Sequence, residues 1–469
     1  MWQIVKNEWQ QLIRNRNLLF ISTGFIALLI VSVILGLIEV NNQKKSFLHA
    51  KNHVREQWEG IKEMNPHNAA HYGSFIFKPY NILANLDEGV YSITGNVLRI
   101  EGHVQNEIIY SEASQVQTIS KFGKLKSSLI FQYIIPILLI FLAFSSISTE
   151  KQLGRIKLLL LQGATTKQLV FGKTLAIWLL GICLLCTTIL VYLTLNAVNL
   201  SPDILARTLF FLLAYSLYYF IITGLTVFFS AQLQNPTASL TAIVGIWIFW
   251  TLFLPQIVLS TTEKMHVLPT RSDMASAMKA DRAKGIDGHN PSDAREKELE
   301  KQVLKKYKVD SLSQLPINFD GLVMQADEEY GNKVWDKHFG SLSNVLHKQK
   351  QTIQLFGSIN PFLSLQNASM GFMASDNLHH QEFLKQAENY RRVFIKQLND
   401  KHAYGGSKTG DWDWKANNAF FKSVPDFTHQ PVQLTAVMSK YLTDLGFLFI
   451  WAGIVVILLI LGAKKMQIL

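Results

Sequence analysis

The sequence predicts an all-α membrane protein with six transmembrane helices and both termini cytosolic, carrying a mixed smaller and a mainly helical larger extracytoplasmic domain. Three observations support this fold class. Several apolar runs reach the roughly 20 residues that a helix needs to cross a bilayer, basic residues gather beside one end of these runs, and two long polar segments separate them. Hydrophobic residues make up 49% of the 469 residues and charged residues 17%, which indicates membrane spans together with water-exposed parts.

The first element is expected over residues 1–17, as an amphipathic cytosolic helix at the membrane interface. Trp2, Val5 and Trp9 fall on one helical face, whereas Lys6 and Arg14 fall on the other. The apolar run 18–38 follows it. Glu39-Val-Asn-Asn stands where a cleavable signal peptide would need small residues, so we expect this run to stay as the first span.

The other five spans are predicted at 128–148, 174–196, 205–229, 238–260 and 444–463. With six spans, three basic groups fall on one side of the membrane: one before the first span, one between the second and third, and Lys464 with Lys465 after the last. The positive-inside rule places that side in the cytosol. The connections 39–127 and 261–443 then form the first and second extracytoplasmic domains.

Both outer segments carry local structural signals. In the first, residues 42–62 are expected to be helical, and turn signals surround a short apolar run at 97–100. In the second, we expect helices at 298–307, at 322–356 as one helix or two, and at 378–401. The stretch 405–414 is rich in Gly, Lys and Asp and is expected to be a mobile turn.

The cytosolic segment 149–173 carries the most informative pattern. Residues 150–161 favour a short helix, with an apolar face made by Leu153, Ile156, Leu160 and Leu161. Gly163 is typical of a helix end, and Thr165 or Thr166 can cap the next helix. Such a helix presents charges and an apolar ridge to a partner. An ordinary amphipathic helix lying on lipid has the same pattern, and spacing alone does not choose between them.

No site for nucleotide or metal is expected in this chain. Gly172-Lys173-Thr174 resembles the end of a phosphate-binding loop, but Lys167 occupies the place of the glycine that such a loop requires. His67 and His71 share a face only if their region is helical, and Pro66 and Gly73 on either side argue against a helix. We therefore predict no metal ligands. His67, His71, His379 and His380 are interpreted by default as surface or interface histidines.

The polar residues of the spans are hydroxyls rather than charges, which argues against ion-driven transport. They could line a path, although hydroxyls more often hold helices together in membranes, and we favour that role. Cys183 and Cys186 share a helix face in the third span and are interpreted as small buried hydrophobic residues. The residues that could line a path are Thr187, Tyr192, Tyr215, Tyr219 and Thr223.

Here the chain resembles a known family. The amphipathic start, the six spans and the segment 150–173 are similar to the permeases of ABC type-2 transporters, in which the loop between spans 2 and 3 docks on an ATP-binding subunit. The turn 230–235 and several outer stretches, such as 71–79, 315–329 and 387–392, resemble a branch with large extracytoplasmic loops and an uncharacterised domain. The resemblance implies ATPase-coupling roles for Glu150, Gly154, Arg155, Lys157, Leu158, Leu161, Gly163, Leu169 and Lys173.

The resemblance also implies the partners. They are an ABC ATP-binding subunit, a second permease subunit that is identical or related, the lipid membrane of the bacterial inner membrane, and an envelope protein as a further candidate. Nucleic acid is not expected, since the acids of the large loop nearly match its lysines. ATP and Mg²⁺ belong to the partner ATPase, so this chain is expected to need no cofactor and to catalyse no reaction.

Two functions remain from the sequence, with a third ranked last. The first is a permease that couples ATP hydrolysis in a separate subunit to export or extraction of an unknown substrate. The second is a non-transporting scaffold whose outer domain binds an envelope protein and is driven mechanically by the ATPase. An outer-face enzyme ranks last, because no glycine-flanked serine elbow or other catalytic constellation stands out.

Overall fold

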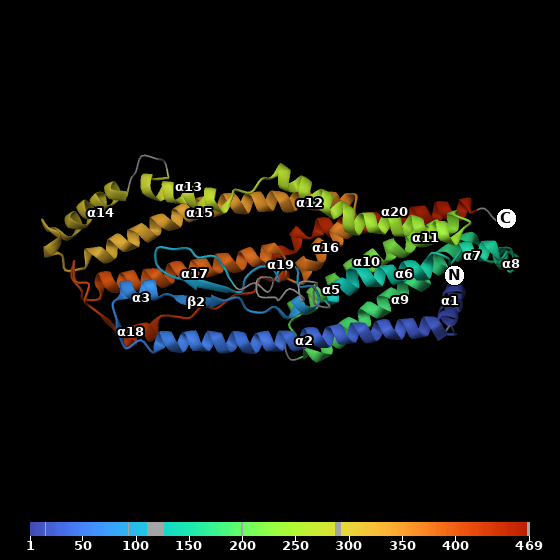
Figure 1. Cartoon of the computed structure of the whole chain (residues 1–469), viewed down its shortest axis with the longest axis horizontal. Helices are drawn as coiled ribbons and strands as arrows, with labels where there is room; N and C mark the ends of the chain where they lie inside the picture. The colour runs from blue at the N-terminus through green and yellow to red at the C-terminus, as the bar shows by residue number, and fades with distance from the viewer. Residues whose placement is uncertain (15, 92, 110–125, 198–199, 287–291, 467–469) are drawn as a thin grey trace.

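The computed structural model describes residues 1–14, 16–91, 93–109, 126–197, 200–286 and 292–466. The molecule is elongated, with a helical bundle at one end and a group of long polar helices at the other (Figure 1). The N-terminus and the end of the last helix both lie at the end of the bundle that is farthest from the polar helices. We call this end the terminal end. The opposite half is called the distal body; it is formed by the far part of the first long helix and by the described residues of 60–109, 266–355 and 377–430.

Six helices among the described residues are long and apolar enough to cross a membrane, which confirms the predicted fold class of an all-α, multi-pass membrane protein. Two of them contain a π-helical turn, η3 and η5, and the second span also includes the short helix α5. The helices of the bundle are α2 (Arg16–Glu59), α5 (Ser127–Leu129) with η3 (Ile130–Ile134) and α6 (Ile135–Ala143), α9 (Thr166–Leu195), α10 (Pro202–Gln232), α11 (Pro236–Ile248) with η5 (Phe249–Phe253) and α12 (Leu254–Met265), and α20 (Leu442–Lys465).

Local sequence explains where these helices begin. Ser201 and Asn235 accept hydrogen bonds from backbone N–H groups of the first turn, and a proline follows each cap at the first helical position. Proline is suited to this position because its missing N–H would have had no helical partner. Thr165 caps α9 together with Gln168 in a reciprocal capping box, which is one of the two caps that the sequence allowed.

The helix α2 is much longer than a membrane span. It runs without a break for 44 residues, or about 66 Å at the ordinary rise of an α-helix, and reaches from the terminal end to the distal body (Figure 1). Its far end is fixed by Trp58, whose indole N–H donates to Phe421 O at 2.9 Å and whose ring lies 4.9 Å from the ring of Phe394. The expected first span and the expected polar helix are therefore one element.

The distal body consists of long helices with two small antiparallel sheets. The longest helix, α15, is continuous, so one of the two predicted alternatives for 322–356 is confirmed. The elements are β1 (Glu63–Met64), α3 (Pro66–Tyr72), β2 (Ser74–Phe77), η1 (Ile82–Asn85), β3 (Val97–Ile100), α13 (Arg271–Lys284), α14 (Ser292–Tyr307), η6 (Leu312–Gln314), α15 (Phe319–Leu355), η7 (Phe356–Ser358), α17 (Asn377–Tyr404), β4 (Ala416–Asn417) and α18 (Asn418–Ser423).

The two outer segments fold together rather than as the two separate domains that the sequence suggested. Strand β1 of the first segment pairs with β4 of the second, and Glu63 faces Asn417 in that register. One hydrophobic core contains Trp58, Ile76 and Ile100 from the first segment with Phe383 and Phe394 from the second. The two segments therefore share one core.

The second outer segment also enters the bundle. Helix α16 (Pro361–Phe372) packs against α10 and α20, and Phe362, Leu365 and Phe372 belong to the same core as the membrane-length helices. A Cβ atom added at Gly371 would lie 2.1 Å from the ring of Tyr441, so glycine permits this close approach. The chain then returns to α20 through α19 (Leu434–Val437) and η8 (Met438–Lys440).

Two smaller predictions differ from the structure. Cys183 and Cys186 are exposed on α9 rather than buried within the chain, because their shared face points away from the bundle core. The stretch 405–414 packs on the start of α15, where the N–H of Phe319 donates to Thr409 Oγ1 at 3.0 Å and the N–H of Gly410 donates to Asp320 Oδ2 at 2.7 Å. These bonds fix a segment that was expected to be mobile.

Candidate functional site

The segment 148–163 forms an elbow of two short helices at the terminal end, α7 (Ser148–Gln152) and α8 (Arg155–Leu161). The predicted single helix over 150–161 is therefore wrong. Gly154 has φ +66°, a left-handed conformation that stops α7 and starts α8 in a new direction. Gly163, at φ +89°, ends α8 in the way the sequence predicted. We call residues 148–163 the α7–α8 elbow.

The outer surface of this elbow is apolar and basic. Leu153, Leu158 and Leu161 are 57%, 60% and 84% exposed, whereas Ile156 is buried at 2% and anchors α8 to the bundle. Arg155 and Lys157 are exposed beside the leucines. The bend at Gly154 thus separates Leu153 from the other residues of the predicted apolar face. Within α8 the exposed ridge includes Leu158, which was not predicted, and excludes Ile156, which was predicted.

Behind the elbow lies a buried ionic triad. Lys173 on α9 is 3% exposed, and its Nζ donates to Glu8 Oε1 at 2.6 Å and to Glu150 Oε1 at 2.9 Å. These three side chains come from α1 (Trp2–Arg14), α7 and α9. Lys173 is therefore shielded from a partner, whereas the side chain of Glu150 keeps 19% exposure. The coupling roles that the resemblance implied for both residues stay predictions. Leu169 is likewise buried, at 2% exposure.

Helix α1 is fixed to the bundle rather than free in the headgroup layer. The indole N–H of Trp9 donates to Ala176 O at 3.0 Å, and Val5 is buried. A Cβ atom added at Gly172 would lie 2.9 Å from Ile4 Cγ2, so the absence of a side chain at Gly172 lets α1 approach α9 closely. The amphipathic face predicted for residues 1–17 therefore packs partly on protein.

The elbow is also attached to the end of α10. Ser230 Oγ accepts hydrogen bonds from the backbone N–H groups of Ile147 and Ser148, at 3.0 and 3.1 Å. Lys151 Nζ donates to Ala231 O. The elbow therefore has direct polar contacts with α10, and the triad joins it to α1 and α9.

The hydroxyl groups proposed from the sequence as lining a path lie mostly inside the bundle. Tyr192, Tyr215 and Tyr219 are fully buried. Tyr215 OH lies 3.1 Å from Ser369 Oγ, Tyr219 OH donates to Phe131 O at 3.0 Å, and Tyr192 OH donates to Ile82 O. Thr223 is buried, and Thr187 is exposed with its hydroxyl bonded to Cys183 O. These contacts fit the helix-joining role that we favoured, and a path-lining role stays a prediction.

Sequence reasoning missed the polar contacts that join the bundle to the distal body. Arg207 is 2% exposed. Its guanidinium donates to Asp203 Oδ2 at 2.7 Å, to Gly371 O at 3.2 Å and to Val432 O at 2.7 Å. The sequence signal for this contact was the i,i+4 spacing of Asp203 and Arg207, which favours an ion pair on one helix. Without that spacing, an arginine at the end of a span indicates only membrane orientation.

A second buried junction surrounds Asp87, just after η1. Its carboxylate accepts hydrogen bonds from Gln132 Nε2 at 3.2 Å, from the N–H of Gly89 at 3.1 Å and from the hydroxyl of Ser369. Burial raises the pKa of Asp87 to about 6, although the hydrogen bonds from Ser369 and Gly89 and the charge of Lys126 oppose the rise. Asp87 thus connects the first outer segment to η3 and to α16.

Six apolar helices, an exposed amphipathic elbow and a distal body that shares its core with the bundle define a multi-pass membrane protein with a large polar extension. Comparison with known protein families identifies two parts of the chain. A family model described as ABC-2 family transporter protein matches residues 65–276, and a model for a domain of unknown function, DUF3526, matches residues 272–430. The chain therefore contains an ABC-2 transporter region followed by an uncharacterised domain, which confirms the predicted resemblance. No curated protein matches the chain.

Proposed function

We propose that this chain is the permease subunit of an ABC-2 transporter, with the terminal end in the cytosol and the α7–α8 elbow docked on a separate ATP-binding subunit. The observation that carries the proposal is the exposed ridge of Leu153, Leu158 and Leu161 beside Arg155 and Lys157. Contiguous exposed apolar side chains with a polar rim are typical of protein interfaces.

The orientation is supported by the positions of the basic residues. Lys6, Arg14, Lys157 and Lys464 are exposed at the terminal end, beside the same ends of the membrane-length helices. Short connections with excess Lys and Arg remain in the cytosol. In a bacterial inner membrane the distal body would then face the periplasm, and ATP with Mg²⁺ would bind the partner subunit.

The geometry behind the elbow supports a coupling role. Closure of an ATPase against the elbow would push on α7, and the Glu8–Lys173–Glu150 triad and Ser230 would pass that push to three helices. Because the triad is buried, Glu150 and Lys173 would act by positioning the elbow. The partner would contact Arg155, Lys157, Leu158 and Leu161.

A cavity between α2 and the distal body supports a substrate that is partly apolar. It has a volume of about 880 Å³ and is lined by Leu35 and Ile38 from α2, by Lys78 and Tyr91 from the distal body and by Lys126 beside α5. Along α2 its lining changes from apolar at Leu35 and Ile38 to polar at Glu39 and Asn42. An amphipathic molecule that enters from the membrane would match this change, which favours export or extraction of such a molecule.

The scaffold alternative rests on α2 and on the buried hydroxyls. A helix of 44 residues fixed at the distal end by Trp58 can transmit force without a transport path. In that case a second permease copy and the ATPase would still bind, and an envelope protein would be held by the distal body.

The proposal is tested by purifying the tagged protein from its own host in mild detergent and measuring the bound ATP-binding subunit by mass spectrometry. Leu161→Glu places a charge on the most exposed leucine of the elbow. The matched control is Leu355→Glu, since Leu355 is 65% exposed at the C-terminal end of α15, away from the elbow. Loss of a central interface anchor costs about 2 kcal/mol or more, so we expect at least a tenfold drop in bound ATPase for Leu161→Glu alone.

The result that contradicts docking at the elbow is equal ATPase recovery with Leu161→Glu and Leu355→Glu. If the complex is intact and hydrolyses ATP but reconstituted vesicles show no substrate flux, the scaffold function is favoured. A second permease in the purified complex would distinguish a heterodimer from a homodimer.

A further inference from the structure

Three histidines of the first outer segment converge on one surface of the distal body. His67 and His71 lie on α3, and His103 lies in the loop after β3. One ring nitrogen from each lies within 4.8 Å of the other two, and this is the only such group of three possible metal ligands among the described residues. The ring centroids are 4.5 Å apart for His67 and His71, 5.3 Å for His71 and His103, and 5.7 Å for His67 and His103.

Local structure brings these residues together. The side chain of Asn65 caps α3 by accepting the N–H of His67 at 2.8 Å, Pro66 occupies the first helical position, and Gly73 ends the helix at φ +67°. The proline and the glycine that argued against a helix therefore mark its two ends. His67 and His71 consequently occupy one helical face.

His103 is held against α3 by an unusual backbone conformation. Its φ is +65°, which is uncommon for a residue other than glycine. The preceding N–H, of Gly102, donates to Ala70 O at 2.9 Å, and this bond draws the loop onto α3. Such conformations cost energy and persist where the surroundings enforce them, often at binding sites. Here the conformation places a third imidazole beside the pair on α3.

We propose that His67, His71 and His103 form a binding site for a divalent transition-metal cation of the zinc and copper class. Imidazole nitrogen suits these ions. The Nε2 atoms of His67 and His71 lie 3.1 Å apart. Two nitrogens bound at about 2.0–2.1 Å to one tetrahedral zinc ion are about 3.3 Å apart. The pair thus stands close to ligating separation, and His103 completes the set by a small movement of its ring.

The surroundings of His103 match those of a metal-binding histidine. Its Nδ1 lies 3.3 Å from Glu328 Oε1, so its Nε2 remains available as a ligand atom. Glu328 is itself fixed, since Arg391 Nη1 donates to its Oε2 at 3.0 Å. A carboxylate that accepts from the second ring nitrogen orients a metal-bound histidine and makes it a better donor.

One ring nitrogen of His67 is already enclosed by protein. His67 Nδ1 is buried and accepts or donates no hydrogen bond to the described residues. The other nitrogen, Nε2, lies beside Nε2 of His71 and is the donor that His67 would offer to a cation.

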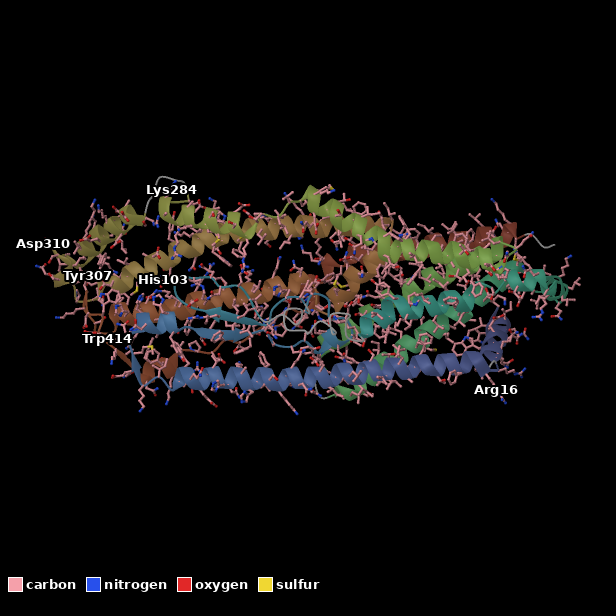
Figure 2. All side chains as sticks on the ribbon, in the orientation of Figure 1. Arg16, His103, Lys284, Tyr307, Asp310 and Trp414 are labelled. Atoms are coloured by element: carbon pink, nitrogen blue, oxygen red, sulfur yellow. The ribbon has the colours of Figure 1, made fainter. Side chains whose placement is uncertain are left out.

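The site has three protein ligands and is open on one side. His71 is exposed, whereas the ring of Trp412 covers His67 at a centroid distance of 5.5 Å. Structural zinc sites are closed by four protein ligands, whereas three ligands leave a position for water or for a donor from another molecule. The geometry therefore points to an exchangeable ion. Figure 2 shows His103 in the distal body, far from Arg16 at the terminal end.

The experiment uses the full-length protein in detergent, stripped of metal and titrated with Zn²⁺ and separately with Cu²⁺ against a competing chelator. The variants are His71→Ala, which alters an exposed side chain, and His103→Ala. The matched control is His53→Ala, because His49 and His53 form another i,i+4 pair, stacked at 6.4 Å on α2, without a third histidine in that group. Thermal unfolding of each variant shows whether the fold is retained.

We expect one ion per chain at the tightest site. His71→Ala and His103→Ala should each weaken binding by about 100-fold or more, and His53→Ala should leave it unchanged. Co²⁺ in the same site should give the intense visible absorption of a four-coordinate ion, which His71→Ala abolishes. The proposal is overturned if the wild type binds no stoichiometric ion, or if folded His71→Ala binds as tightly as the wild type. It is equally overturned if His53→Ala loses as much affinity as His71→Ala, since exposed histidine pairs would then explain the binding.

Discussion

Replacing Lys173 by Met tests whether the buried triad holds the N-terminal helix and the elbow in place. The substitution keeps most of the volume but leaves Glu8 and Glu150 close together, with side chains only 18% and 19% exposed. Removing one partner from a buried ion pair costs roughly 3–5 kcal/mol, because the remaining charge loses its compensation. The two carboxylates keep some solvent contact, so we expect about 3 kcal/mol, the lower end of that range.

Undocking of α1 gives a direct readout of this cost. Val5 is 3% exposed between α1 and α9, so a cysteine at this position, introduced after replacing Cys183 and Cys186 by Ser, should react slowly with a maleimide. A loss of about 3 kcal/mol corresponds to more than a hundredfold change in the docking equilibrium, and the Lys173→Met variant should therefore react much faster. The control is Lys167→Met, since Lys167 is exposed at the start of the same helix.

The triple variant Lys173→Met, Glu8→Gln, Glu150→Gln separates charge from shape. Neutral amides in place of the two acids remove the uncompensated charges, and replacing a whole buried ion network by neutral groups is often nearly neutral for stability. We expect the triple variant to regain most of the protection of the cysteine. The reasoning is refuted if Lys173→Met labels at the wild-type rate, or if the triple variant labels as fast as the single one.

Three further predictions concern thermal stability in detergent. Ser230→Ala removes the acceptor of two backbone N–H groups and should lower the free energy of unfolding by about 1–3 kcal/mol. Ser239→Ala changes a buried hydroxyl without a partner among the described residues, and the stability of this variant should lie within about 0.5 kcal/mol of the wild type. Equal effects of the two substitutions would contradict a stabilising contact between Ser230 and the start of α7. Asp87 has a folded-state pKa raised from 3.8 to about 6, so the folded state binds more protons, and stability should fall by about 2 kcal/mol as pH rises from 4 to 7. The Asp87→Asn variant should lack this part of the pH dependence, and parallel profiles would contradict it. Arg391→Met removes the buried arginine that pairs with Glu328 and leaves Glu388 with Arg392 alone, so it should destabilise the distal body by about 3 kcal/mol. The more exposed Arg392→Met should cost less than about 1 kcal/mol, and a reversed order would contradict the reasoning.

The membrane part could be predicted because its signals are local. Apolar length sets each span, and the caps at Thr165, Ser201 and Asn235 are visible as residue types beside those runs. The elbow was located for the same reason, between two spans. Its bend was missed because the periodicity of residues 150–161 is helical throughout, and Gly154 was interpreted as a family residue rather than as a left-handed break.

The triad and the histidine cluster depend on tertiary contacts and gave weaker signals. Glu8 and Lys173 form an ion pair only when α1 packs on α9. This packing depends on Gly172, which has no side chain to keep α1 away. His67 and His71 were noticed, but the proline before them and the glycine after them were weighed as helix breakers. Proline at the first helical position and glycine just past the end instead favour a short helix, and that asymmetry was the signal available in the sequence. Nothing in the spacing of His103 indicated that it would join them.

The position of α10 explains how one helix can connect the elbow at the terminal end with the side of the bundle that faces the distal body. At the terminal end Ser230 holds the start of the elbow, and at the other end Arg207 binds the carbonyl groups of Gly371 and Val432. These two contact points are about 35 Å apart along one unbroken helix. Since α9, α20, α6 and α16 all pack on α10, local unwinding would expose buried side chains on every side. A push on the elbow is therefore expected to tilt α10 as a rigid body, and α16 would carry that tilt into the distal body.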